Sequence, residues 1–316
     1  MCTEVRRCAP LLREVDADGG TVYDAQPSTL VPLMKGAQQA TLIGDHKQLP
    51  AVVSSPVARR ERLHVSLFER LKTHEGVRSV MLDTQYRMHP DIAAFPNLAF
   101  YDDELRTAPS GGGPSLQSKY LSDGESVCFI DYEGREHFER QSVANKRELE
   151  VVLDIVGDIL HRNPTLEPAE IGVISPYAAQ TAKLQNIFRD WRLAPLKLVP
   201  LLGRARANAA TQVEVNTVDG FQGREKRVII LSTVRSNSRG FIGFLSDKRR
   251  LNVALTRAKE ALFVVGNAKT LQCGAPSSGA DGAPREVDPD ADPTVWRRYL
   301  SWLRERGLVS TYKPSR

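Results

Sequence analysis

Apolar and polar residues follow one another in blocks that predict alternating strands and helices from about residue 79 to residue 267. Strands are predicted at 126–132, 171–174, 213–217, 226–234 and 261–267, and the 226–234 segment has the strongest pattern of a buried strand. Helical spacing of apolar residues predicts helices at 145–160, 177–191 and 251–260. Because the central strands are apolar along their whole length, they predict a parallel sheet covered by helices on both faces.

A second, shorter pattern precedes this region. The stretch QATLIGD (39–45) predicts a buried strand that ends in a loop, with helices at 29–36 and 65–74 on either side. Residues 79–88 begin as a strand and become polar, and 89–101 predict a helix that is broken near Pro96. Residues 1–38 are expected to be loosely packed.

Composition indicates two segments without regular secondary structure. Residues 108–118 and 273–293 are rich in Gly, Pro, Ser and Asp or Gln, and they predict a surface loop and a disordered linker. An amphipathic pattern then predicts a C-terminal helix. The length of 316 residues allows one large domain or two ordinary ones.

Charge and cysteine content narrow the classes of function only slightly. The formal net charge of +5 fits a nucleic-acid partner, although many other proteins share it. The four cysteines form no CxxC pair and stand beside no histidine cluster, which predicts reduced thiols and no metal site. The chain lacks an apolar run of membrane-spanning length and a secretory signal pattern, so we predict a cytoplasmic or nuclear protein.

Polar motifs follow several of the predicted strands. GDHKQLP (44–50) follows the strand that ends at Ile43, and QYRMHP (85–90) follows the one that ends near Leu82. SPY (175–177) and DGFQGRE (219–225) follow later strands. Ligands in open α/β sheets bind beyond the carboxyl ends of the strands, so these motifs predict one functional rim.

Arginines in the next motif suggest phosphate chemistry. Arg250 and Arg257 are seven residues apart, which on one helix places them on one face about 10 Å apart. Residues 248–250 have the composition of a solvated basic face. Arg257 instead lies among small and apolar residues, where its charge needs a partner.

The motifs GDHKQLP, QYRMHP, IGVISPY, VNTVDGFQGREKRVIILSTVRS and RRLNVALTRAKEALFVVGN, in this order and spacing, resemble the superfamily 1 helicases of the Upf type. The resemblance covers roughly residues 27–270. It implies an α/β fold of the RecA-like P-loop NTPase kind, with a mostly parallel sheet and helices on both faces. Residues 1–60 would be the end of a first RecA-like domain, 61–272 a second one, 273–292 a linker and 293–316 a terminal helix.

In this family two RecA-like domains hold ATP and Mg²⁺ between them. The resemblance implies that Gln48 senses the γ-phosphate or its attacking water, and that Arg87 and Arg257 contact the phosphates from the second domain. Such arginines are worth about 10³-fold or more in rate. Tyr86 would pack against adenine.

The resemblance assigns the remaining nucleotide contacts to the GRE segment. Glu225 would bind the ribose or position the nucleotide, beside Arg224. Gly220 and Gly223 would let the backbone approach phosphate closely.

Nucleic acid would cross the top of the two domains. The implied contacts are Thr217, Ser175, Pro176 and Tyr177, whose hydroxyl and backbone groups would hold phosphates and sugars without regard to sequence. A packing role for Tyr177 at the start of a helix is an equal alternative.

Two parts of the family pattern are absent from the sequence. No glycine begins a GxxxxGK[ST] phosphate loop, and Asp16, Asp18 and Asp24 are not followed by the Glu of a magnesium-binding Asp-Glu pair. The sequence is either a fragment of a longer helicase or a natural helicase that kept one half. The intact Arg87, Glu225 and Arg257 favour the first explanation.

The sequence therefore predicts the C-terminal part of an ATP-dependent helicase acting on single-stranded RNA or DNA, and it leaves protein partners open. The alternative is a non-catalytic RecA-like module that binds nucleic acid or a protein. In either case we expect no appreciable ATP hydrolysis by the 316-residue chain alone.

Overall fold

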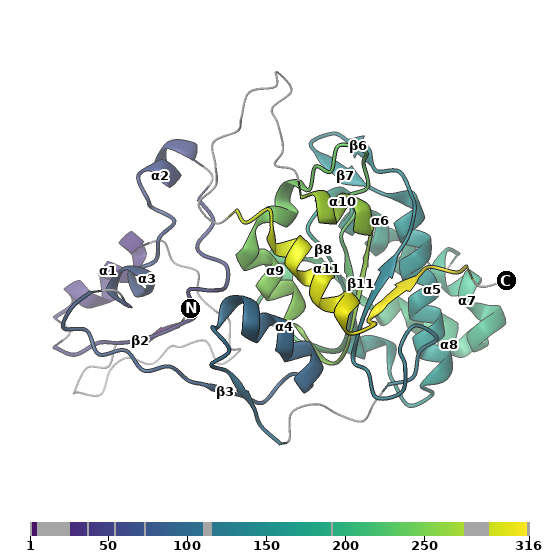
Figure 1. The fold of residues 1–316 in the computed structure, drawn as a ribbon, viewed down its shortest axis with the longest axis horizontal. Coiled ribbons are helices and arrows are strands. Elements are labelled where there is room, and N and C mark those ends of the chain that lie inside the picture. The colour runs from purple at the N-terminus through teal and green to yellow at the C-terminus, as the bar shows by residue number, and fades with distance from the viewer. Residues whose placement is uncertain are drawn as a thin grey trace. The chain divides into compact units, whose positions relative to one another are not determined.

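The computed structural model describes residues 2–4, 26–36, 38–53, 55–72, 74–109, 116–190, 192–274 and 291–314 (Figure 1). The chain divides into two compact units, Met1–Leu82 and Asp83–Arg316. Within the described ranges no helix combines the length and the apolarity needed to cross a membrane. Most of the predicted surface loop and linker, at 110–115 and 275–290, lies outside the described residues.

The second unit is built on a six-stranded sheet in which every neighbouring pair is parallel. The strand order is β12 (Val309–Thr311), β5 (Val127–Asp131), β11 (Ala258–Gly266), β10 (Lys226–Ser232), β8 (Ile171–Ser175) and β9 (Glu214–Thr217). The apolar runs predicted as central strands are therefore strands, and the predicted parallel sheet is confirmed.

Helices cover both faces of this sheet (Figure 1). Ile230 and Phe263 belong to a core that includes residues of α5 (Lys146–Arg162), α6 (Ala178–Arg189), α7 (Ala194–Leu202) and α8 (Arg204–Ala209). Side chains alternate along a strand, so the buried Ile229 and Leu262 point to the opposite face. That face carries α4 (Pro90–Phe100), α9 (Lys248–Leu255) and α11 (Val295–Glu305), while α10 (Ala268–Cys273) packs against α11.

Helix α5 shows how the sequence sets an element in place. Asn145 caps its amino end, with its side-chain oxygen accepting a hydrogen bond from the backbone N–H of Glu148 (3.4 Å). An apolar stripe from Leu149 to Leu160 then faces the sheet. The helix predicted at 145–160 is therefore confirmed.

The helix predicted at 251–260 is wrong in its second half. Helix α9 ends at Leu255, Thr256 is its C-terminal cap, and β11 begins at Ala258. The residues from Ala258 onward pair with β10, and those from Leu262 onward also pair with β5, and this pairing outweighs their local helical pattern. Arg257 therefore does not lie on the helix with Arg250, and the expectation that they share a helical face is also wrong.

Helix α4 runs through Pro96 without a break, contrary to the prediction. Its buried side packs against other aromatic rings. The ring centroid of Phe95 lies 4.6 Å from that of Tyr299 and 5.7 Å from that of Trp302. These two rings belong to α11, the amphipathic terminal helix that the sequence predicted. Packing between the two helices offsets the backbone hydrogen bond that a proline cannot donate.

The strand predicted to begin at residue 79 is also wrong. Val80 and Leu82 are exposed, and the short strand β3 (Thr84–Gln85) begins only after them. It pairs in parallel with β4 (Arg106–Thr107) outside the main sheet. A separate antiparallel hairpin, β6 (His137–Glu139) and β7 (Ser142–Ala144), completes the unit.

Among its described residues, the first unit contains only short elements. Strand β1 (Cys2–Glu4) pairs antiparallel with β2 (Thr41–Ile43), and the helices are α1 (Gln26–Met34), α2 (Pro56–Arg60) and α3 (Leu67–Lys72). The predicted strand at 39–45 is thus present, but its Ile43 is exposed rather than buried. Most of residues 1–38 lies outside the described ranges, so their expected loose packing stays a prediction. The division into RecA-like domains at residue 60 likewise stays a prediction, and the compact units divide after Leu82.

Candidate functional site

The motif QYRMHP forms a turn that one side chain closes. The side-chain oxygen of Gln85 accepts hydrogen bonds from the backbone N–H groups of Arg87 (3.0 Å) and Met88 (2.8 Å). Its amide donates to the Met88 carbonyl (2.9 Å) and to the hydroxyl of Thr107 (2.8 Å). The turn leaves Tyr86 71% exposed, the condition that packing against a ligand ring requires.

Arg87 is directed toward the GRE segment. Its Nε forms an ion pair with Glu225, and its Nη1 donates to the Thr256 carbonyl (3.2 Å). Lys259 Nζ lies 2.7 Å from the other carboxylate oxygen of Glu225. Glu225 immediately precedes β10, while Thr256 and Lys259 flank the start of β11. We call Arg87, Glu225, Thr256, Arg257 and Lys259 the amino-end cluster, because it lies at the amino ends of these strands.

Glu225 stays ionised in this cluster. Partial burial alone would raise its pKa, but the hydrogen bonds and charges of Lys259 and Arg87 outweigh that effect and hold the pKa below its ordinary value. The side chains of Arg87, Glu225 and Lys259 are between a third and two fifths exposed. Two accessible cations therefore share one carboxylate, an arrangement that suits an incoming phosphate.

Arg257 lies behind Thr256 and is 2% exposed. Its Nε donates to the Val253 carbonyl (3.0 Å) and its Nη2 to the Thr256 hydroxyl (2.9 Å). The guanidinium thus meets the carboxyl end of α9, where the helix dipole favours a positive charge. The predicted need for a partner is met here by helix-end acceptors. Thr256 receives hydrogen bonds from both predicted arginines, Arg87 on its carbonyl and Arg257 on its hydroxyl.

The DGFQGRE loop joins the two ends of the sheet. It begins after Thr217, at the carboxyl end of β9, and ends at Glu225, at the amino end of β10. The buried ring of Phe221 packs on Gly172 of β8, where an added Cβ would lie 2.7 Å from the ring. The prediction of one functional rim is therefore wrong: Thr217 and the SPY motif lie at the carboxyl end, and Arg87 and Glu225 lie at the amino end.

Glycine is required at two positions of this loop, for a different structural reason at each. Gly223 has φ +78°, a backbone conformation that glycine adopts without strain. A Cβ on Gly220 would lie 2.3 Å from Oδ1 of Asn216, so close packing requires glycine there. Arg224 forms an ion pair with Glu214 at the start of β9. Approach of these glycines to a phosphate stays a prediction.

The SPY motif at the carboxyl end is largely buried. Ser175 is fully buried and its hydroxyl accepts a hydrogen bond from the Tyr177 N–H (3.4 Å). Tyr177 is 3% exposed, donates its hydroxyl hydrogen to the Ile242 carbonyl (2.9 Å) and accepts from Arg235 (3.3 Å). Tyr177 thus has the surroundings of the packing alternative, whereas Pro176 is half-buried at the surface.

Thr217 lies beside this motif on the neighbouring strand. Its hydroxyl accepts a hydrogen bond from the Gly220 N–H (3.1 Å) and so closes the turn after β9. Residues 175 and 217 are partners in the pairing of β8 with β9. The structure therefore brings together the residues predicted to contact nucleic acid, with Thr217 and Pro176 more accessible than Ser175 and Tyr177.

A strained turn follows β10 at the same end. Val234 has φ +69°, and the Arg235 N–H donates to the Thr233 carbonyl (2.7 Å), the geometry of a γ-turn. The Val234 N–H donates to both carboxylate oxygens of Glu148 (3.0 Å each). Glu148 also accepts from the hydroxyls of Ser232 and Tyr132, yet burial outweighs these bonds and raises its pKa to about 7.

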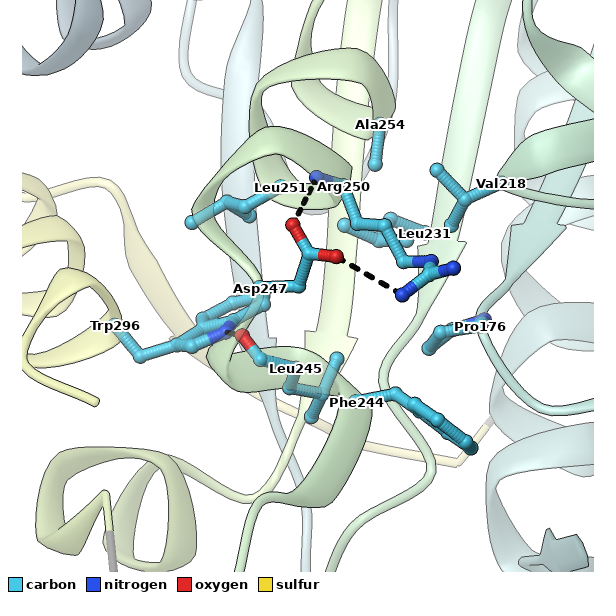
Figure 2. A pocket seen from close by; sticks show the side chains of 10 residues that line it. All are labelled: Pro176, Val218, Leu231, Phe244, Leu245, Asp247, Arg250, Leu251, Ala254 and Trp296. Carbon is cyan, nitrogen blue, oxygen red and sulfur yellow. Dashed lines mark hydrogen bonds and ion pairs between the residues drawn. The ribbon is translucent and has the colours of Figure 1, made fainter. Parts of the chain in front are cut away.

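A small pocket opens beside Pro176 (Figure 2). It is shallow and open to solvent, and Arg250 and Phe244 are among its lining residues. Arg250 Nη1 lies 2.9 Å from Asp247, and its Nε and Nη2 lie 3.3 Å from Asp219. Arg250, which the sequence placed on a solvated basic face, is thus held by two carboxylates.

The first unit carries the GDHKQLP motif directly after β2. The Gln48 side-chain amide donates to Asp45 (2.8 Å), and the same carboxylate accepts from the Lys47 N–H (2.9 Å). Asp45 therefore fixes both the loop and the direction of the Gln48 amide. The part that Gln48 plays toward phosphate stays a prediction.

Sequence reasoning missed Gln85, Thr256 and Lys259. All three lie inside the quoted motifs, so their positions were marked, but their contacts were not. Thr256 contacts Arg87, which is 169 positions away, and Lys259 contacts Glu225 in another motif, while Gln85 closes a local turn. Within the described ranges, no group of three or more His, Cys, Asp or Glu side chains is arranged to hold a metal ion.

Comparison with known proteins identifies relatives of this chain. Two family models, each described as "AAA domain", match residues 63–269 and 25–56. Probable helicase MAGATAMA 3 of Arabidopsis thaliana is 40% identical over 255 residues, which is 78% of this chain and 29% of that protein. Regulator of nonsense transcripts 1 homolog of Drosophila melanogaster is 37% identical over 293 residues, 92% of this chain and 22% of that protein. ATP-dependent helicase NAM7 of Saccharomyces cerevisiae is 34% identical over 289 residues, 90% of this chain and 26% of that protein.

The chain spans less than a third of the length of these curated relatives. The longer family match covers more than half of the chain, and it includes every strand of the main sheet except β12, together with both ends described above. The parallel α/β sheet of the second unit is of the RecA-like kind that the motifs implied. The chain therefore belongs to the AAA-domain family, within the superfamily 1 helicases of the Upf type.

Proposed function

We propose that this chain is the C-terminal part of an ATP-dependent helicase that couples ATP hydrolysis to translocation on single-stranded RNA or DNA. The observation that carries the proposal is the amino-end cluster. Residues from QYRMHP, GRE and TRAK, far apart in the sequence, meet there around one carboxylate and one threonine.

The donor set of the cluster fits a nucleotide phosphate. Arg87 is partly exposed and shares Glu225 with Lys259, so it can exchange one oxygen partner for another without leaving the carboxylate unpaired. We assign Arg87 to the γ-phosphate, Glu225 to the ribose and the exposed Tyr86 to the adenine ring. Arg224 and Gly223 would line the same approach.

Arg257 is buried and contacts this site through Thr256. Because it shares Thr256 with Arg87, a change in one arginine alters the acceptor that the other uses. We propose Arg257 as the second arginine toward the phosphates and Gln48, in the first unit, as the group that senses the γ-phosphate. Bound Mg²⁺ would neutralise phosphate charge, but the described residues suggest no ligand set for it in this chain.

The carboxyl end is the proposed nucleic-acid side. Thr217 and Pro176 lie at the surface there, backed by the buried Ser175 and Tyr177. Hydroxyl and backbone groups of this kind bind the sugar-phosphate backbone of any sequence. The two ends of one rigid sheet would thus link nucleotide binding to strand binding.

A chimera tests the catalytic proposal. Residues 83–316 would replace the matching part of the Drosophila relative, and ATP hydrolysis would be measured with and without single-stranded RNA. We expect hydrolysis that the strand stimulates, and a fall of about 10³-fold in kcat for Arg87→Ala. The control Arg192→Ala removes a 71% exposed arginine from a surface pair with Asp190 and should change nothing.

The same experiment distinguishes the catalytic proposal from the non-catalytic alternative. A folded chimera that binds single strands but hydrolyses no ATP would support a binding module instead. For the 316-residue chain alone we expect no appreciable hydrolysis, because Arg87 and Arg257 act only on phosphates held opposite them. Strand-stimulated hydrolysis by that chain, lost in Arg257→Ala, would contradict this expectation.

A further inference from the structure

Phe244 is an exposed aromatic residue at the carboxyl end of the sheet (Figure 2). It belongs to the one-turn helix η4 (Gly243–Ser246) and is 58% exposed. One neighbour is the buried Tyr177, whose ring centroid lies 5.8 Å away at a tilt of 52°. The other is Arg250, whose guanidinium carbon lies 5.8 Å from the ring centroid.

The turn that carries Phe244 is held firmly. Buried or half-buried side chains and backbone groups from distant elements bind its carbonyls: Tyr177 Oη to Ile242 O (2.9 Å), Trp296 Nε1 to Leu245 O (2.7 Å) and Asp292 N to Ser246 O (2.8 Å). Leu245, next in the chain, is 5% exposed. A rigid backbone that still leaves a large ring exposed is the form of a preorganised contact.

Charge and position favour a nucleic-acid ligand over a protein. Arg250 is fixed beside the ring by Asp247 and Asp219, and Lys248 next to them is exposed. Val218, which lines the same pocket, directly follows Thr217. A single ring beside a pocket is far smaller than the roughly 800 Å² per partner that a stable protein interface buries.

We propose that Phe244 is a stacking platform for an unpaired base of a single-stranded nucleic acid, with Arg250 at the edge of the stacked base. The inference rests on the proposed function, because it adds a base contact to the backbone contacts at Thr217 and Pro176. Every base has a π-face, so such a platform increases affinity without selecting sequence. Figure 2 shows the ring and the guanidinium on the same side of the pocket.

Strand binding to the full 316-residue chain tests the proposal. The probes are a fluorescein-labelled oligouridine of about twelve nucleotides and a strand of the same length in which every nucleotide is abasic. By fluorescence anisotropy, we expect Phe244→Ala to weaken oligouridine binding about tenfold and to leave abasic-strand binding unchanged. Phe244→Trp should restore oligouridine binding.

Salt dependence and a second phenylalanine separate stacking from other causes. The slope of log Kd against log salt should be the same for Phe244→Ala and wild type, because a stacked ring releases no counterions. Phe138, 77% exposed on β6, is the matched control, and Phe138→Ala should bind both strands as wild type does.

Two results would overturn the inference in different ways. If Phe244→Ala binds oligouridine as tightly as wild type, as a protein-docking role would give, the platform is refuted while the proposed function stands. If the wild-type chain binds neither strand, the proposed nucleic-acid side fails together with the platform.

Discussion

Two glutamates at opposite ends of the same sheet have opposite shifts in pKa. Glu225, at the amino end, is partly exposed between Arg87 and Lys259, and these cations hold its pKa below the ordinary value. Glu148, at the carboxyl end, is fully buried and accepts hydrogen bonds from hydroxyl and backbone N–H donors. Burial there raises the pKa to about 7.

The contrast shows two ways of positioning functional groups. At the amino end, charges hold one another near solvent, so a charged ligand can replace one partner by another. At the carboxyl end, a buried carboxyl group and a strained turn fix the backbone, and the exposed groups are an aromatic ring and short side chains. The first arrangement suits phosphate chemistry and the second suits a fixed surface for a strand.

The amino end can be tested through its two arginines. Arg257 is 2% exposed and fills acceptors at the end of α9, whereas Arg87 is near the surface. We expect Arg257→Ala to lower the free energy of unfolding by about 4 kcal/mol, from the lost packing and the unfilled acceptors, and Arg87→Ala by less than about 1 kcal/mol. Urea unfolding monitored by circular dichroism measures both. Equal losses of unfolding free energy would contradict the distinction between a buried Arg257 that stabilises the fold and an accessible Arg87 that does not.

The two glutamates should give opposite slopes of stability against pH. A raised pKa means that Glu148 contributes stability fully below its unfolded pKa of 4.5 and loses it as pH rises through about 7. In wild type this loss is up to about 3 kcal/mol. Glu148→Gln should remove this pH-dependent loss of stability, as measured by urea unfolding between pH 4.5 and pH 7.

Glu225 serves as the counterpart in that experiment. Its pKa is lowered, so its contribution is present above the unfolded pKa of 4.5 and is lost as pH falls further. Glu225→Gln should therefore alter only the acid side of the curve, and weakly, because the pair is exposed to solvent. A Glu148→Gln variant with an unchanged slope would refute the contrast.

Backbone strain at Val234 gives a smaller effect. Its φ of +69° is unfavourable for a β-branched residue, while its side chain is fully buried. Val234→Ala and Val234→Gly both lose the buried side chain, but only glycine relieves the strain. We expect Val234→Gly to be more stable than Val234→Ala by about 1 kcal/mol, the reverse of the usual order. Thermal unfolding compares the two, and an alanine variant that is the more stable would disprove the strain.

The sequence predicted the core strands because burial on both faces leaves a plain signal, a run such as 228–231 that is apolar throughout. The resemblance assigned Arg87, Glu225 and Arg257 to one nucleotide, and the structure places them in one cluster, while their contact with a nucleotide stays a prediction. The sequence could not predict where α9 ends, since residues 256–260 suit a helix locally, whereas β11 begins at Ala258 through its pairing with β10. The return of the DGFQGRE loop across the sheet depends on Phe221 packing against Gly172, a contact that no local pattern records.

Two exposed aromatic rings give the smallest expected effect on stability and the strictest test of the two ends. Tyr86 is 71% exposed beside Arg87, and Phe244 is 58% exposed beside Arg250. Each alanine variant should change the free energy of unfolding by less than about 0.5 kcal/mol, because little buried area is lost. In the chimera, Tyr86→Ala should weaken binding of a fluorescent ADP analogue but not of oligouridine, and Phe244→Ala the reverse. If either variant weakens both ligands equally, the two ends do not bind different ligands, and the division of function along the sheet is wrong.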